Sequence, residues 1–160
     1  MSVVESARPI QLVAGILALC FTVTGQAPSL FGTWKLNLAK SSYGSVSPPY
    51  KRSTCRIEPL DDGLKVTYDM VGVRGGVTHI EWTGRLDGKD YPMEGVDDVL
   101  TNAYTKIDDR TYDIVVKADG SRAATARITI APDGRSLMTV TTSRDAQGRT
   151  RNTTTVYERQ

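Results

Sequence analysis

The amino-acid sequence predicts an all-β fold: an antiparallel up-and-down meander closed into a barrel of about 8–10 strands. Two-residue turn signals recur between short runs rich in Val, Ile, Thr and Tyr, at 62–63, 75–76, 87–88, 119–120, 133–134 and 147–148. Most are Asp-Gly or Gly-Gly, and glycine supplies the positive φ that tight hairpins require. Side chains in the runs alternate with a period of two, as in strands that have one buried face.

Before the strands comes a leader. Residues 10–23 form an almost unbroken apolar run, which is shorter than the roughly 20 residues that span a bilayer but typical of a secretory signal. We expect residues 1–27 to be a signal peptide cleaved after Ala27, residues 28–160 to form a single barrel domain, and the protein to be periplasmic or secreted. A retained N-terminal anchor helix is the alternative.

The first half of the chain contains five candidate strands. Trp34 and Leu36 share one face of the first, Cys55 alternates with polar neighbours in the second, and Tyr68 stands on the apolar face of the third. The fourth precedes the turn at 87–88, and Pro92 shortens the fifth or opens the barrel there, because proline cannot donate to a sheet ladder. We place these strands near 31–38, 51–58, 64–71, 76–86 and 89–94.

The second half contains five more. The sixth ends before the turn at 108–110, and Ile114 and Ile128 belong to alternating runs in the seventh and eighth. The turns at 133–134 and 147–148 bound the ninth and begin the tenth. We place these strands near 100–107, 111–118, 122–131, 136–144 and 150–159.

The long segment after the first strand, residues 39–50, is rich in Ser, Gly and Pro and has no helical period. It is either a mobile flap over the barrel mouth, carrying Tyr43 and Tyr50, or an ordered loop that plugs that end.

Composition excludes several functions. With 20 Lys and Arg against 18 Asp and Glu, the net charge is +2, which gives no electrostatic footprint for nucleic acid or for anionic membranes. After leader cleavage one cysteine, Cys55, would remain, so no internal disulfide is expected. One histidine and one cysteine make no familiar metal site, and we expect no cofactor.

The two ends of the predicted barrel carry a family resemblance. Gly32-Thr33-Trp34-Lys35-Leu36 resembles the first-strand motif of lipocalins, and with the terminal Val156-Tyr157-Glu158-Arg159 it resembles their fatty-acid-binding-protein relatives in the calycin superfamily. A bacterial lipocalin-like secreted protein fits this pattern. The resemblance implies that Trp34 packs inside one end of the barrel and that Arg159 lies over it.

The sequence also departs from those relatives. Fatty-acid-binding proteins have a helical lid where this chain has residues 39–50, and they hold a carboxylate with an Arg-x-Tyr pair on the last strand. Here the matching positions are Thr155 and Tyr157, so the tyrosine is present and the arginine is not.

Three functions follow from the sequence. The first is an exported carrier of a small apolar molecule, bound in a hollow interior lined by Leu36, Tyr68, Met70, Trp82 and Tyr157. The second is a cofactor-free cyclase or isomerase, for which His79 and Glu81 are the weak acid–base candidates; if Ile80 and Trp82 face the core, both instead face solvent. The third is a filled structural or interaction barrel. The sequence does not indicate an oligomeric state.

Overall fold

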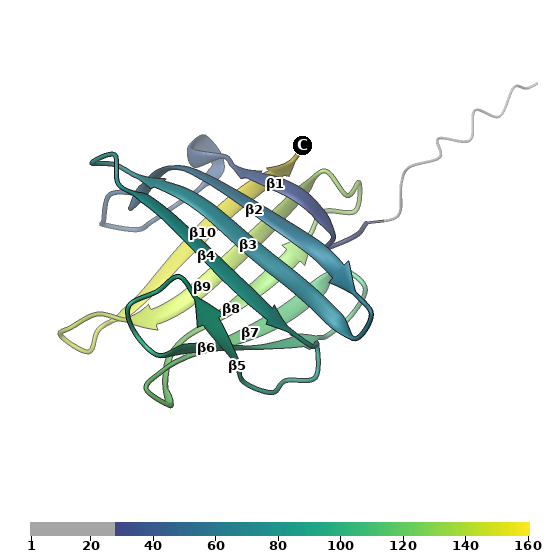
Figure 1. Cartoon of the computed structure of the whole chain (residues 1–160). Coiled ribbons are helices and arrows are strands. Elements are labelled where there is room, and N and C mark those ends of the chain that lie inside the picture. The colour runs from purple at the N-terminus through teal and green to yellow at the C-terminus, as the bar shows by residue number, and fades with distance from the viewer. Residues whose placement is uncertain (1–27) are drawn as a thin grey trace, which may run out of the picture.

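A computed structural model describes residues 28–160, so the predicted leader lies outside the described residues. Ten antiparallel strands close into one barrel, which confirms the predicted fold class (Figure 1). Their bounds are β1 (Gly32–Leu36), β2 (Tyr50–Leu60), β3 (Gly63–Gly72), β4 (Val77–Gly84), β5 (Tyr91–Glu94), β6 (Leu100–Lys106), β7 (Thr111–Ala118), β8 (Ser121–Ile130), β9 (Ser136–Arg144) and β10 (Thr150–Arg159).

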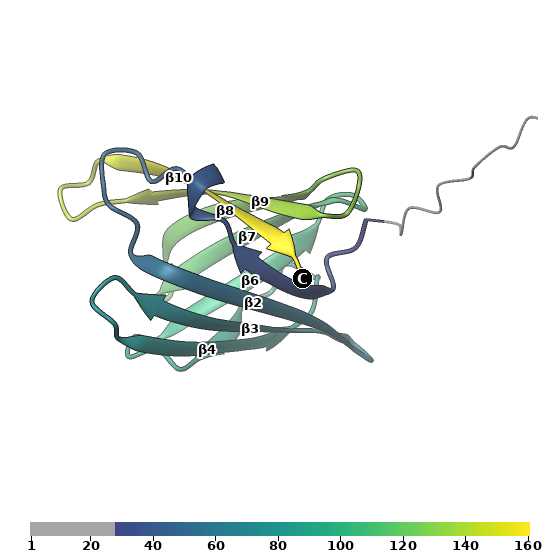
Figure 2. The same cartoon turned by 90° about the horizontal axis from the view of Figure 1, so that it is seen from above.

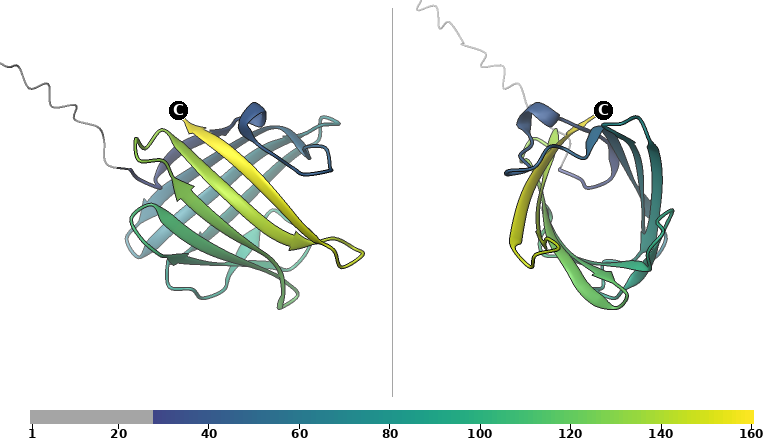
Figure 3. Two further views of the ribbon diagram at one scale, coloured as in Figure 1. Left: turned by 180° about the vertical axis from the view of Figure 1, so that it is seen from behind. Right: turned by 90° about the vertical axis from the view of Figure 1, so that its left-hand side faces the viewer.

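Each strand pairs with the next along the chain, and β1 closes the ring by pairing with both β2 and β10. Trp34 is the centre of this closure, because it stands opposite Cys55 on one side and Arg159 on the other. The view along the axis shows the strands as a continuous wall (right-hand panel of Figure 3). In the described part of the chain, no helix is long and apolar enough to cross a membrane.

The strand β5 is the weakest part of the wall. It pairs with β4 only at Glu81↔Glu94 and Trp82↔Met93, and with β6 only at Tyr91↔Asn102 and Pro92↔Thr101. The indole Nε1 of Trp82 donates to the carbonyls of Tyr91 and Asn102, both at 3.2 Å. These side-chain hydrogen bonds connect β4 to β5 and β6. The barrel is therefore closed beside Pro92, where the sequence had suggested a gap.

The segment between β1 and β2 begins with a single 3₁₀ turn, η1 (Leu38–Lys40), which the sequence did not indicate. Ser42 then forms a bridge with Thr154 of β10 through two backbone hydrogen bonds of 2.7 Å. Seen from above, the segment crosses beside β10 before it enters β2 (Figure 2). Its first part is thus attached to the barrel wall.

Buried side chains fill the end of the barrel where β1 begins. Leu30, just before β1, is buried, and its carbonyl accepts a hydrogen bond of 2.9 Å from Trp34 Nε1. Around Trp34 the core contains Ile57, Leu64, Val66, Trp82, Tyr104, Tyr112, Ile114, Ile128, Ile130 and Leu137. This end of the barrel is therefore closed by packed apolar groups.

Candidate functional site

Arg159 caps the closed end of the barrel. Its guanidinium carbon lies 4.2 Å from the centre of the Trp34 ring, where the family resemblance places it. Its three nitrogens donate to the carbonyls of Ser29, Phe31 and Gly134. Gly32 makes room for it, because φ at this glycine is +138° and an added Cβ would collide with the guanidinium. Any ligand must therefore reach the interior from elsewhere.

Away from the end that Arg159 caps, the interior is lined by small side chains on β8, β9 and β10. Tyr157 and Leu137 are paired and face inward, so the register also turns Thr155, Thr153, Thr139, Thr141, Ala126 and Ala124 inward. All six are partly accessible to solvent although they face the inside of the barrel. An eight-stranded barrel is just wide enough for side chains or one small ligand, and this barrel has ten strands with small residues on one wall. These six residues are therefore less completely covered than the core residues around Trp34.

On β9 the apolar side chains face outward and the threonines face inward, the reverse of the usual distribution in a folded protein. Met138 and Val140 face outward and are 42 % and 37 % exposed, whereas Thr139 and Thr141 between them face inward. The register thus places hydroxyl groups on the inner face of β9 and apolar groups on its outer face. The sequence analysis did not identify this row of hydroxyl groups; the one signal for it is that Thr139 and Thr141 lie two and four residues after the inward-facing Leu137.

The opposite wall is aromatic. The Trp82 and Tyr104 rings are in contact with centres 4.3 Å apart and planes tilted by 35°, and Tyr91 meets Trp82 edge-on at 6.0 Å. Tyr91, Met93 and Tyr68 are partly buried and pack against the core on the same inner face. The interior thus joins an apolar, aromatic wall to a wall of hydroxyl groups.

The phenol and thiol groups inside the barrel are uncharged near neutral pH. Tyr157 and Ser53 share a hydrogen bond of 3.2 Å between their hydroxyls. Burial raises the pKa of Tyr157 to about 12 and that of the Cys55 thiol to about 12. The pKa of Tyr68 is raised well above its usual value, first by the neighbouring Cys55 and then by burial. These groups can donate or accept hydrogen bonds but carry no charge.

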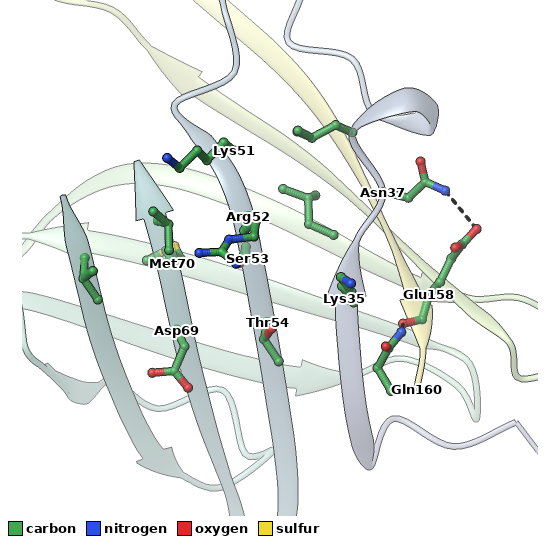
Figure 4. Close-up of a pocket in the computed structure, with 14 residues that line it drawn as sticks. Lys35, Asn37, Lys51, Arg52, Ser53, Thr54, Asp69, Met70, Glu158 and Gln160 are labelled. Carbon is green, nitrogen blue, oxygen red and sulfur yellow. Dashed lines mark hydrogen bonds between the residues drawn. The ribbon is translucent and has the colours of Figure 1, made fainter. Parts of the chain in front are cut away.

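A groove of about 890 Å³ opens beside the interior, where β2 diverges from β1 (Figure 4). The β1–β2 pairing ends at Lys35↔Thr54, so the first residues of β2 have no partner on β1. Leu36, Ser53 and Met70 face the interior and also line this groove. The groove therefore reaches the inside of the barrel from its flank.

Three cations stand on the groove without an ion pair among residues 28–160: Lys35, Lys51 and Arg52. Asp69 and Glu158 lie there too, but Asp69 is bound to His79 and Glu158 to Lys40 and Asn37. In Figure 4 the Lys51 and Arg52 side chains lie at the end of the groove nearest Met70. The rim of the groove is thus more basic than the interior behind it.

The structure turns all five sequence-predicted lining residues inward. Tyr68 stands opposite Cys55, and Met70 stands opposite Ser53. Leu36 and Met70 lie beside the groove, Tyr157 lies next to Ser53, and Trp82 belongs to the packed core.

His79 and Glu81 lie on the outer face of β4, where they form part of a chain of charged groups. His79 Nδ1 is 2.7 Å from Asp69 Oδ1, His79 Nε2 is 3.5 Å from Glu81 Oε1, and Lys65 Nζ is 2.7 Å from the same oxygen. The hydrogen bond to Asp69 raises the pKa of His79, and the one from Lys65 lowers that of Glu81. The His79 side chain is 56 % exposed, so this pair sits on a solvated sheet surface, away from the interior.

The chain was also compared with known proteins. No family model matches the chain, and no curated protein matches it. Among solved structures, a siderocalin, Ex-FABP, described as functioning through dual ligand specificities, aligns over 81 % of this chain and 69 % of its own length, with 14 % identity and a TM-score of 0.37. The strand order itself establishes the architecture. The chain is an all-β protein whose ten antiparallel strands close into one barrel.

Proposed function

We propose that this protein binds a small, mainly apolar molecule inside the barrel, in the half of the interior that lies away from the Arg159 cap. The observation that carries the proposal is the incomplete burial of residues whose side chains face inward, such as Ala126, Thr141 and Thr153. In a barrel filled by its own side chains these positions would be buried as completely as Ile128 and Ile130 are near the closed end.

The lining favours an apolar body. Tyr91, Met93 and Val116 present partly accessible apolar surface to the interior, and removing such surface from water stabilises a complex by about 25 cal/mol per Å². The groove between β1 and β2 supplies a lateral route, because Leu36 and Met70 border both spaces.

The test is binding of a neutral apolar fluorophore, N-phenyl-1-naphthylamine, to the purified protein. We expect saturable fluorescence enhancement, abolished by Ala126→Phe, which places a ring in the interior opposite Ile114 and Thr141. The matched control is Thr125→Phe, one residue away and facing outward. Equal loss of binding in both variants, or no binding by the wild type, would refute the proposal.

We also propose that the barrel is exported and that residues 1–27 are removed. The support is the apolar run at 10–23 with small residues, Gly25 and Ala27, before Pro28. Mass spectrometry of the protein recovered from the periplasm or medium tests this. A mature chain that begins near Pro28 is expected, and an intact chain retained in the membrane fraction would contradict it.

A further inference from the structure

One buried polar side chain inside the barrel, Asn102, has an oxygen without a hydrogen-bond partner in the described part of the chain. Asn102 faces inward between Tyr91 of β5 and Val116 of β7 and is 8 % exposed. Its backbone carbonyl accepts from Trp82 Nε1, but its side-chain Oδ1 has no hydrogen bond to any described residue. Buried side-chain oxygens are nearly always hydrogen-bonded in native proteins, so this amide calls for a partner that residues 28–160 do not supply.

The interior around it holds no free charge. At inward strand positions that are buried or partly buried, no Lys, Asp or Glu occurs among residues 28–160. The only cations there are Arg151 and Arg159. Arg151 Nε is 3.3 Å from Asp145 Oδ2, and Arg159 is bound to three carbonyls over the Trp34 ring. A carboxylate or ammonium group drawn into this space would lose its hydration without gaining a counter-ion, which is costly.

The uncharged polar groups inside the barrel are numerous. Ser53, Tyr157 and the inward threonines offer hydroxyls, and burial raises the pKa of Tyr104 as it does that of Tyr157, so both phenols stay protonated. A ligand hydroxyl can both donate and accept. It therefore complements these groups, and it complements the amide of Asn102 whichever way that amide is turned.

Resting on the proposed function, we propose that the ligand is an uncharged molecule with an apolar body and a hydroxyl or amide group, and that Asn102 binds that group. This separates the site from one that holds a fatty-acid carboxylate. Asn102 is then a specificity-determining residue: it selects among apolar molecules of equal size by the polar group they carry, because leaving its amide unpaired in the complex weakens binding.

The experiment measures displacement of N-phenyl-1-naphthylamine by three probes of equal chain length: 1-decanol, 1-fluorodecane and decanoate. For wild type we expect decanol to bind more tightly than the other two. In Asn102→Leu, which is close to isosteric, the ratio of the fluorodecane and decanol Kd values should fall about 3- to 10-fold, the effect of one hydrogen bond. Comparing this ratio between proteins cancels the different hydration of the two probes.

Two controls keep the result interpretable. Thr101→Val alters the adjacent, outward-facing residue of β6 and should leave the ratio unchanged. If Asn102→Leu fails to fold, the wild-type protein still provides a test, since the side-chain amide NMR signals of Asn102 should shift with decanol and not with fluorodecane.

The outcomes separate the two proposals. Decanoate binding as tightly as decanol at neutral pH would overturn the uncharged-ligand inference while leaving the interior as the binding site; Lys51 and Arg52 at the groove would then be the residues to test. A ratio that is unchanged in folded Asn102→Leu, or an amide signal that does not respond to decanol, would overturn the role of Asn102. If neither the fluorophore nor any probe binds, the proposed function itself fails.

Discussion

Replacing Arg159 with leucine should destabilise the barrel more than any other single change to a charged residue of β10. The substitution removes three hydrogen bonds from the guanidinium, to the carbonyls of Ser29, Phe31 and Gly134, and its contact with the Trp34 ring. A hydrogen bond to a charged group contributes about 1.5–3 kcal/mol and a cation–π contact about 0.5–2 kcal/mol.

These contributions do not add, since the carbonyl of Phe31 lies at the exposed rim and regains water when the arginine is lost. We therefore expect a net loss of about 2–4 kcal/mol in the free energy of unfolding. Urea denaturation followed by tryptophan fluorescence measures it directly. For a domain of this size each kcal/mol lowers Tm by about 3–5 °C.

Two further variants define the cause. Arg159→Lys keeps the charge but cannot bind three carbonyls at once, so it should recover less than half of the loss. Arg56→Leu is the matched control, an exposed arginine on the outer face of β2 with no ion pair among the described residues, and should change stability by less than about 0.5 kcal/mol. A loss below about 0.5 kcal/mol in Arg159→Leu, or a loss equal to that in Arg56→Leu, would refute the role of Arg159 as a cap.

Three further predictions concern single residues. Gly32→Ala should cost about 1–3 kcal/mol in urea denaturation, because φ is +138° and the new Cβ would displace Arg159; in an Arg159→Leu background much of the steric part should vanish, and full additivity would contradict the collision. The raised pKa of His79 means that its contact with Asp69 stabilises the fold below the usual histidine pKa of 6.5, and that this contribution is lost as pH rises through the folded-state pKa. His79→Gln should therefore flatten the decline in Tm over that range, and an unchanged Tm–pH profile would contradict it. Cys55, with its pKa raised to about 12 by burial, should resist iodoacetamide in the folded state at neutral pH and react only on unfolding; rapid labelling at Cys55 in native protein, located by mass spectrometry, would contradict its burial.

The fold could be predicted from the sequence because its signals are local. Gly134 and Gly148 adopt positive φ at the turns that the Asp-Gly and Gln-Gly pairs indicated. The alternation of Ile128 and Ile130 likewise identified an inner face that the structure buries. Strand limits followed from these two signals, and sequential pairing followed from the short connections.

The interior could not be predicted in the same way. Hydrophobic alternation assigns Met138 and Val140 to the core, whereas the register turns Thr139 and Thr141 inward. The unpaired amide of Asn102 depends on what β5 and β7 place beside it, and nothing in the local sequence shows that. The groove arises because β2 continues beyond the end of its pairing with β1, a long-range geometry that turn signals do not encode.

The joining of the first and last strands sets a condition on folding. Arg159 bonds to Phe31 across 128 positions of sequence, and β1 has only five residues with which to hold both of its neighbours. Contacts so distant along the chain form late and slow the search for the native state. On the ribosome, the ring cannot be completed until β10 has emerged, long after β1 has been synthesised. Loss of Arg159 and Gln160 would remove one of the three residue pairs between β1 and β10 together with the cap over Trp34, and would leave Lys35↔Glu158 and Leu36↔Tyr157 to hold the ring closed.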